Sequence, residues 1–342
     1  MIPGQSRVTI EDVAFHAGVS RAAVSKVIRN AYGVSDAMRS KVQDAIDTLG
    51  YRPRAAARTM RGSSYTIGIE LPNTTNSFFH SVIGGMTDAL ADTPYQLIIA
   101  PARPGHIGGP DAIQQLADRQ VDGIIAFAPQ VSVEWLEQFA LQTPTVLIGR
   151  HDDSVNYDTV VDDDELGSRL VVDHLIGLGH RDIVHLTIPI EDLGGHAQLP
   201  HARREVGFVN AMTEAGLAGR IRIERTAQTE EAVCRRTHEL LDEPHPPTAL
   251  YAGHDDLALG ALRAVAERGL TAADLSVVGY DDTTISAHPL ISLTTVNQSA
   301  SSYGERVSRL LLERMAGRTE AVHDVITPTL KGRGSTTAPN PR

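Results

Sequence analysis

The chain has 342 residues, of which 42% are hydrophobic, so it is long enough to bury substantial cores in two or three domains. Its single cysteine, Cys234, excludes an internal disulfide and favours a reducing compartment. The first residues include Glu11 and Asp12 and lack the apolar run of a signal peptide, and the longest apolar stretches are strand-sized, so we expect a cytoplasmic protein without membrane contact.

Charge is unevenly distributed along the chain. The whole sequence carries a net charge of −11, but residues 1–62 contain ten basic and five acidic side chains, a balance of +5 that leaves −16 for the remainder. A small basic unit attached to an acidic body is typical of a module that contacts a polyanion. On charge alone, a solvated basic surface without a partner remains the alternative.

The first sixty residues have the pattern of short helices. Thr9 and Asp12 have the spacing of a capping box, which predicts a helix over about 9–16 with one apolar stripe. Gly18 ends this helix in the turn AGVS, and Ser20 can cap a second helix. A third helix is expected between a serine cap at 35 and a glycine stop at 50.

Two short helices joined by a tight turn that contains glycine form a helix-turn-helix, whose second helix is sized for the major groove. Arginine can bind guanine O6 and N7, which is worth about 1–3 kcal/mol of discrimination between bases. Phosphate contacts fix the register without reading sequence. We expect base contacts from Arg21, Ala22 and Lys26, and phosphate contacts from Ser20, Ser25 and Arg29. A three-helix packing unit with incidental basic residues is the alternative.

From Thr66 onward, short apolar runs alternate with helical segments, which is typical of parallel sheets with helices on both faces. Two such series predict two lobes, and a ligand site in the cleft at the carboxyl ends of their strands. The expected strands are 66–71, 95–100, 123–127, 145–149, 182–186, 220–224, 249–253 and 275–280. The expected helices are 78–90, 111–119, 133–141, 166–177, 204–215, 230–241 and 256–268.

Residues 8–61 resemble the LacI/GalR family of bacterial repressors along their whole length, through the helix-turn-helix spacing, the VS…VS frame of the second helix, and the LGY sequence with its following proline. The resemblance implies that residues 54–61 form a hinge helix that folds on the operator and inserts an apolar wedge, here Met60, into the minor groove. Arg54 stands where the family commonly has Asn, and Ala23 where Thr is common. The implied DNA contacts add Thr9, Ala23, Arg54, Ala57 and Met60 to those above.

The blocks IGIELPNTTNSFF, RREVGFVNAM, PTALYAGHDDLALGALRA and DLSVVGYDDTTIS are similar to the effector domain of this family, which is itself similar to periplasmic sugar-binding proteins. The implied fold is an N-terminal all-α helix-turn-helix domain with a hinge helix, then an α/β domain of two doubly wound parallel-sheet lobes. The implied bounds are 1–52 for the DNA-binding domain, 53–63 for the hinge and linker, and 64–335 for the effector-binding and dimerisation domain. Lobe 1 would comprise about 64–165 and 299–326, including a returning helix at 301–315, and lobe 2 about 166–298 and 327–335, with 336–342 as a disordered tail.

The resemblance also implies an effector site. A carboxylate that accepts hydroxyl hydrogens, an arginine that donates, and an aromatic wall suit a carbohydrate, although Phe78 has an even chance of being ordinary core. His254 stands where the family often has Asn, Gly149 and Arg150 replace an acidic residue, and the segment 190–202 is longer than usual. The implied ligand residues are Asn76, Phe78, Phe79, Arg150, Arg204, His254, Asp255, Asp281 and Gln298.

Signals for other chemistry are weak. No Gly-rich segment has the order of a phosphate-binding loop, and no cofactor is expected. His174, His180 and His185 lack the helical spacing of metal ligands, and Cys234 is interpreted as a small buried apolar residue, so no metal site is predicted. The DDD sequence at 162–164 is interpreted as a helix N-terminal cap, because no nucleophile or acid/base partner accompanies it.

These observations predict a homodimeric transcriptional regulator that binds a pseudo-palindromic double-stranded operator, lies at the nucleoid when bound, and responds to a small molecule in the interlobe cleft. Two alternatives remain open: a solute-binding protein that uses the same clamp, and an enzyme that acts in the cleft. The residues do not indicate the effector, whether it induces or co-represses, or whether the protein represses or activates.

Overall fold

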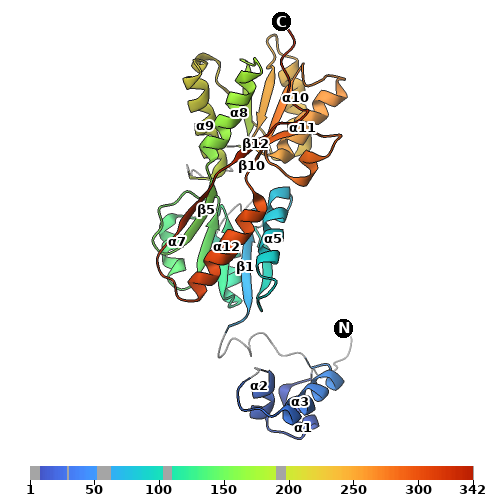
Figure 1. Cartoon of the computed structure of the whole chain (residues 1–342), viewed down its shortest axis with the longest axis vertical. Coiled ribbons are helices and arrows are strands. Elements are labelled where there is room, and N and C mark those ends of the chain that lie inside the picture. The colour runs from blue at the N-terminus through green and yellow to red at the C-terminus, as the bar shows by residue number, and fades with distance from the viewer. Residues whose placement is uncertain (1–7, 29–30, 52–62, 103–109, 190–197, 342) are drawn as a thin grey trace. The chain divides into compact units, whose positions relative to one another are not determined.

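The structure is a computed structural model, and it describes residues 8–28, 31–51, 63–102, 110–189 and 198–341 (Figure 1). The chain divides into two compact units after Ser64. Among the described residues, no helix is both long enough and apolar enough to cross a membrane.

The first unit is the predicted three-helix bundle, with α1 (Ile10–Ala17), α2 (Arg21–Ile28) and α3 (Asp36–Leu49). The expected capping box begins α1, because the Thr9 hydroxyl accepts from the Asp12 amide at 3.3 Å and the Asp12 carboxylate accepts from the Thr9 amide at 2.7 Å. The three helices bury one apolar cluster, Val13, Ala14, Val24, Val27, Val42 and Ala45. The tight turn ends α1 at Gly18, whose φ of 65° is the left-handed conformation that glycine adopts without strain.

The second unit contains two six-stranded sheets, which confirms the two parallel-sheet lobes. The sheet of lobe 1 has the order β11-β5-β4-β3-β1-β2, and all its neighbouring strands are parallel. Its strands are β1 (Thr66–Leu71), β2 (Gln96–Pro101), β3 (Gly123–Phe127), β4 (Thr145–Ile148), β5 (Asp158–Asp162) and β11 (His323–Ile326). Helices α5 (Ser77–Ala89) and α12 (Ala300–Met315) pack on one face, and α6 (Pro110–Asp118) and α7 (Val133–Ala140) on the other.

The sheet of lobe 2 repeats this arrangement with the order β12-β10-β9-β8-β6-β7, in which only the β10 and β12 pair is antiparallel. Its strands are β6 (Ile183–Thr187), β7 (Arg222–Arg225), β8 (Ala249–Ala252), β9 (Ser276–Asp281), β10 (Thr294–Asn297) and β12 (Thr329–Lys331). Its helices are α8 (Asp164–Gly177) and α9 (Pro200–Glu214) on one face, and α10 (Glu230–Leu241) and α11 (Asp255–Glu267) on the other. The short 3-10 helices are η2 (Ala218–Arg220) and η3 (Thr284–Ala287).

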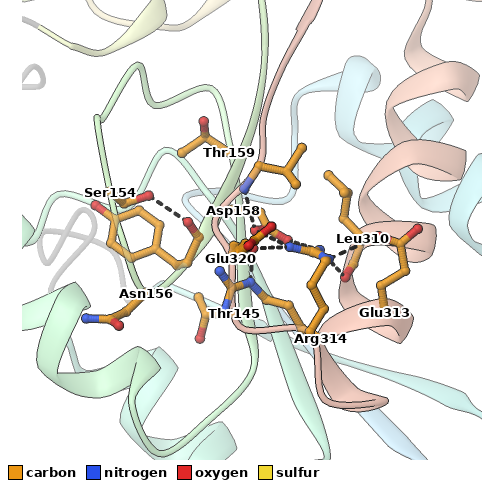
Figure 2. Close-up of polar contacts among 12 residues, drawn as sticks. Thr145, Ser154, Asn156, Asp158, Thr159, Leu310, Glu313, Arg314 and Glu320 are labelled. Atoms are coloured by element: carbon orange, nitrogen blue, oxygen red, sulfur yellow. Dashed lines mark hydrogen bonds and ion pairs between the residues drawn. The ribbon is translucent and has the colours of Figure 1, made fainter.

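Among the described elements, the chain crosses between the lobes three times: between β5 and α8, between β10 and α12, and between β11 and β12. A buried ion-pair network holds the segment that leads into β11, and thus into the last of these crossovers, in lobe 1 (Figure 2). The Asp158 carboxylate at the start of β5 lies 2.9 Å from Arg314 Nε on α12, and it accepts hydrogen bonds from Arg318 and from the Val322 amide. The network therefore fixes the segment between α12 and β11 against β5, so that this crossover starts from a fixed strand.

The expected disordered tail at 336–342 is wrong for the residues that the structure describes there. The Thr337 amide donates to the Ser276 hydroxyl at 3.1 Å, and the Asn340 amide donates to the Ala273 carbonyl at 2.9 Å. The polar composition suggested a solvated tail, but these backbone groups are paired along lobe 2.

Candidate functional site

The predicted base-contacting residues lie on the exposed side of α2. Arg21, Ala22 and Lys26 are exposed, whereas Val24 packs into the core of the first unit. Arg21 forms an ion pair with Glu11 at 3.2 Å, and both side chains are about two-thirds exposed, at 69% and 68%. Exposed pairs of this kind contribute little, so Arg21 can exchange this partner for DNA.

The remaining DNA-contact predictions divide into three groups. Thr9 and Ser20 both use their oxygens as helix caps, and the Ser20 hydroxyl accepts from the Ala23 amide at 3.1 Å. The Ser20 hydroxyl still has its proton to donate to a phosphate, whereas the Thr9 hydroxyl donates its proton to the Asp12 carboxylate at 2.7 Å. Ala23 and Ser25 are half-buried on α2. The predictions for Arg29, Arg54, Ala57 and Met60 lie outside the described residues.

A cavity of about 980 Å³ lies between the carboxyl edges of the two sheets. This is where two facing doubly wound lobes are expected to bind a ligand. Phe79 and Phe127 form an aromatic wall in lobe 1, with ring centroids 5.0 Å apart. Phe78 reaches the cavity but is also 6% exposed in the core of lobe 1. The predicted ligand residues that line the cavity are Asn76, Phe78, Phe79, Arg204, His254, Asp281 and Gln298.

Arg204 is held rigidly at the lobe 2 side of the cavity. Its Nε donates to Asp164 at 2.7 Å, one Nη donates to the Gly253 carbonyl at 2.8 Å, and its guanidinium carbon lies 3.6 Å from the ring centre of Tyr280. A buried guanidinium that is paired, bonded and stacked is fixed in orientation.

Asp162, at the end of β5, was interpreted from sequence only as part of a helix cap, but it lines the cavity. It accepts hydrogen bonds from Tyr280 in lobe 2 at 2.5 Å and from Tyr303 in lobe 1 at 3.2 Å. Burial, reinforced by the charge of Asp164, raises the pKa of Asp162 to about 7. The position of Asp162 at the end of a buried strand was the sequence signal that could have identified it.

Asp281 lies at the end of β9 with a φ of 128°, which is rare for a non-glycine residue and costs of order 1–3 kcal/mol. Gln298 donates to its carboxylate at 2.5 Å, and burial raises the pKa of Asp281 above its ordinary value. Asp255 was predicted as a ligand residue but does not line the cavity. Its carboxylate accepts from Thr283 at 2.8 Å and from Ser286 at 2.6 Å. Asp255 therefore positions the loop that follows Asp281.

His254 has no hydrogen-bond partner within the described structure at either ring nitrogen, although it is only 5% exposed and lines the cavity. Burial, followed by the charge of Arg204, lowers its pKa to about 3, so the ring is neutral. A second buried imidazole, His201, lies 5.6 Å away between ring centroids and bonds to Thr187 at 3.2 Å. His201 was interpreted as a solvated loop residue, but it lies in the first turn of α9 and lines the cavity.

Arg150 was predicted as a ligand residue, but it does not line the cavity. Its side chain is 1% exposed and donates to the carbonyls of Pro129 and Val131 at 2.7 and 2.6 Å. It also pairs with Asp152 at 2.8 Å, and the Tyr157 hydroxyl bonds to the same carboxylate. A buried guanidinium needs partners for its charge and its hydrogen-bond donors. Arg150 therefore ties the loop after β3, which contains Pro129 and Val131, to the loop after β4, which contains Asp152.

One further contact joins the lobes through two helix N-termini. The amide and the hydroxyl of Ser77, in the first turn of α5, both donate to the Asp256 carboxylate, in the first turn of α11, at 3.3 Å. Burial raises the pKa of Asp256, and the bonds from Ser77 oppose this shift. This pair, which we call the interlobe clasp, was not predicted.

A helix-turn-helix unit followed by a two-lobed domain with a ligand-sized cavity defines a DNA-binding regulator with an effector domain. Residues 9–54 match the model of bacterial regulatory proteins of the lacI family, and residues 172–336 match the periplasmic binding protein-like domain. The chain is 31% identical to catabolite control protein A of Priestia megaterium over 91% of this chain and 94% of that protein.

Solved structures agree with these matches. The lac repressor dimer bound to operator and an anti-inducer has 26% identity and a TM-score of 0.80, covering 97% of this chain and 100% of that one. The complex of the transcriptional regulator CelR with cellobiose has 29% identity and a TM-score of 0.68, covering 96% and 100%. The chain belongs to the lacI family of bacterial regulatory proteins. It is a DNA-binding transcriptional repressor of that family, and its relatives are not enzymes.

Proposed function

We propose that this repressor acts in the cytoplasm as a homodimer on a pseudo-palindromic operator, at the nucleoid, and that an uncharged carbohydrate in the interlobe cavity changes its operator affinity. The observation that carries the proposal is the polar set at the cavity, with an oriented guanidinium at Arg204, a carboxylate at Asp281 and an unpartnered imidazole at His254. Hydroxyl groups can donate to the carboxylate, accept from the guanidinium, and do either with a neutral imidazole.

The charge of the cavity favours an uncharged ligand over an anion. Its described lining contains four acidic side chains and one cationic side chain, Arg204, which is already paired with Asp164. Burial keeps His254 and His201 neutral, so they add no positive charge. A volume of about 980 Å³ is at the upper end of ordinary ligand pockets and accommodates a disaccharide. The CelR complex contains cellobiose, which supports this size class.

The homodimer is supported by the edge of the lobe 1 sheet. Strand β2 ends the strand order and exposes Ile98 and Ile99, at 42% and 45%. An exposed apolar edge strand is a pairing surface that monomeric proteins avoid. The related lac repressor structure is a dimer on operator DNA.

The test begins with selection of duplexes from a random pool by the purified full-length protein at moderate salt. Operator affinity is then measured with and without a panel of mono- and disaccharides. We expect one palindromic sequence to be enriched, and a member of the panel to change its affinity by about 5- to 150-fold. Asp281→Asn, which keeps the shape of the side chain, should abolish that response without loss of operator binding. Absence of any preferred duplex would refute the DNA-binding role, and an unchanged response of Asp281→Asn would refute the ligand site.

A further inference from the structure

A cluster of metal-ligating side chains lies on the outer helices of lobe 2, away from the lining of the cavity. Cys234 and His238 are four residues apart on α10, and Glu267 ends α11. From sequence, Cys234 was interpreted as a small buried apolar residue without metal-ligand spacing. One ligand atom from each of the three residues lies within 4.8 Å of the other two.

Close packing of the two helices brings these groups together. A Cβ atom at Gly260 of α11 would lie 2.7 Å from the Glu230 carbonyl of α10, so only glycine permits this approach. The Glu267 Oε2 atom lies 3.6 Å from the Cys234 sulfur and 2.9 Å from His238 Nε2. With zinc–ligand bonds of about 2.0–2.3 Å, tetrahedral geometry places neighbouring ligand atoms about 3.3–3.6 Å apart. The oxygen-to-sulfur separation lies in this range and the oxygen-to-nitrogen separation is about 0.4 Å below it, while the sulfur and His238 Nε2 lie within 4.8 Å of each other. Small side-chain shifts would therefore let the three atoms face one ion.

We propose that Cys234, His238 and Glu267 bind a thiophilic divalent metal ion, Zn²⁺ or Co²⁺, with water as the fourth ligand. Thiolate, imidazole and carboxylate together select such ions over Mg²⁺ and Ca²⁺. Arg263 donates to Glu267 Oε1 at 2.8 Å and leaves Oε2 directed at the other two ligands. The bound ion connects α10 to α11.

The neighbouring Arg268 competes with the metal for His238. Its Nε donates to His238 Nδ1 at 2.8 Å, which places the ring proton on Nε2. Metal binding at Nε2 moves that proton to Nδ1, and Arg268 then retains its two bonds to Asp242, at 2.7 and 2.8 Å. In an Arg268→Gln variant, the side-chain oxygen of the glutamine accepts the Nδ1 proton of His238. Metal-bound histidines are usually oriented by such an acceptor at the second ring nitrogen.

The test uses Co²⁺ added to the full-length, untagged protein in metal-free buffer. Because the chain has a single cysteine, a thiolate-to-cobalt charge-transfer band can come only from Cys234. We expect this band, with the intense visible absorption of tetrahedral cobalt, to saturate at one ion per chain and to disappear on addition of Zn²⁺. Zn²⁺ should also raise the melting temperature of the wild-type protein.

Variants separate this site from adventitious binding by a thiol. Cys234→Ser should abolish the charge-transfer band, and His238→Ala and Glu267→Gln should each weaken cobalt binding at least tenfold. Arg268→Gln should bind more tightly than wild type. His245→Ala, an exposed histidine outside the cluster, is the matched control and should bind as wild type does. The proposal would be overturned if wild type showed no charge-transfer band. It would also be overturned if His238→Ala and Glu267→Gln bound cobalt as tightly as wild type does.

Discussion

His254 is the cavity residue whose contribution to ligand binding can be separated from its contribution to folding. Its buried ring makes no hydrogen bond in the described structure, so His254→Leu removes two unsatisfied polar atoms and keeps a similar volume. We expect the free energy of unfolding to rise by up to about 1–3 kcal/mol, while the ligand response of the operator complex falls about tenfold or more. Chemical denaturation and ligand titration measure the two effects.

The control for this prediction is His201→Leu at the neighbouring imidazole. That ring bonds to Thr187, so the same replacement leaves a hydroxyl without its partner and should lower stability. If His254→Leu lowered stability as much as His201→Leu does, the ring of His254 would have a partner within the protein.

Because of Glu70, we expect the free energy of unfolding of lobe 1 to fall as the pH rises. Burial raises its pKa to about 8, against a weaker effect of the Phe127 amide, which donates to Oε2 at 3.3 Å. In the unfolded state the Glu70 carboxyl has its ordinary pKa of 4.5. Between that pH and about 8, Glu70 is therefore protonated in the folded state and ionised in the unfolded state. Its contribution to stability is fully present below that value and is lost as the pH rises toward 8, with a slope of at most about 1.4 kcal/mol per pH unit.

Glu70→Gln should remove this slope, so that its advantage over wild type grows between pH 5 and about 8. The fluorescence of Trp135, the single tryptophan of the chain, follows denaturant unfolding of lobe 1 at each pH. Parallel pH profiles of wild type and variant would show that Glu70 is ionised in the folded protein.

At the residue scale, sequence reasoning located cavity-lining residues at the carboxyl ends of strands. Asn76 lies in the loop that follows β1, Asp281 is the last residue of β9, and both line the cavity. Arg150 also follows a strand, but the left-handed turn at Gly149 precedes it and its side chain enters lobe 1, which residue order does not reveal. The partners of Asp162 are more than a hundred positions away in the sequence, so no local pattern could identify this network.

At the element scale, the long amphipathic helices and the buried central strands were predicted to within a few residues. The strands missed by the residue pattern are β5, β10, β11 and β12, which have three to five residues each. Such runs are too short for periodicity to identify. Their pairing comes from distant segments, as between His323 and Thr159, so tertiary contacts decide their conformation.

Two adjacent glycines of α5 test how closely this helix packs on α12. A Cβ at Gly85 would lie 2.5 Å from the Ser301 carbonyl, whereas a Cβ at Gly84 meets no atom within 4 Å. Gly85→Ala should lower the free energy of unfolding by about 1–3 kcal/mol through overpacking. Gly84→Ala should raise it by about 0.5–1 kcal/mol, because alanine favours the helix. Denaturant unfolding followed by Trp135 fluorescence measures both, and equal effects would show that α5 can move away from α12.

At the scale of the whole molecule, the lobes are connected by three crossovers between described elements and by the bonds of Asp162 to tyrosines of both lobes. Rotation about such a connection is the motion by which two-lobed domains close. The interlobe clasp between Ser77 and Asp256 lies outside this connection. Its bonds are specific to one angle between the lobes, so it biases the equilibrium between lobe arrangements.

Ser77→Ala tests the clasp without altering the cavity, because Asp256 lines the cavity and Ser77 does not. The variant loses the hydroxyl bond and keeps the amide bond, so the present lobe arrangement loses about 0.5–1.5 kcal/mol, or roughly 2- to 10-fold in the equilibrium between arrangements. Operator affinity without ligand and the ligand concentration for half-maximal response should both shift, in the same direction for an inducer and in opposite directions for a co-repressor. Ser81→Ala, one turn further along α5, should change neither. If Ser77→Ala and Ser81→Ala give the same values in operator titrations, the angle between the lobes does not depend on the clasp.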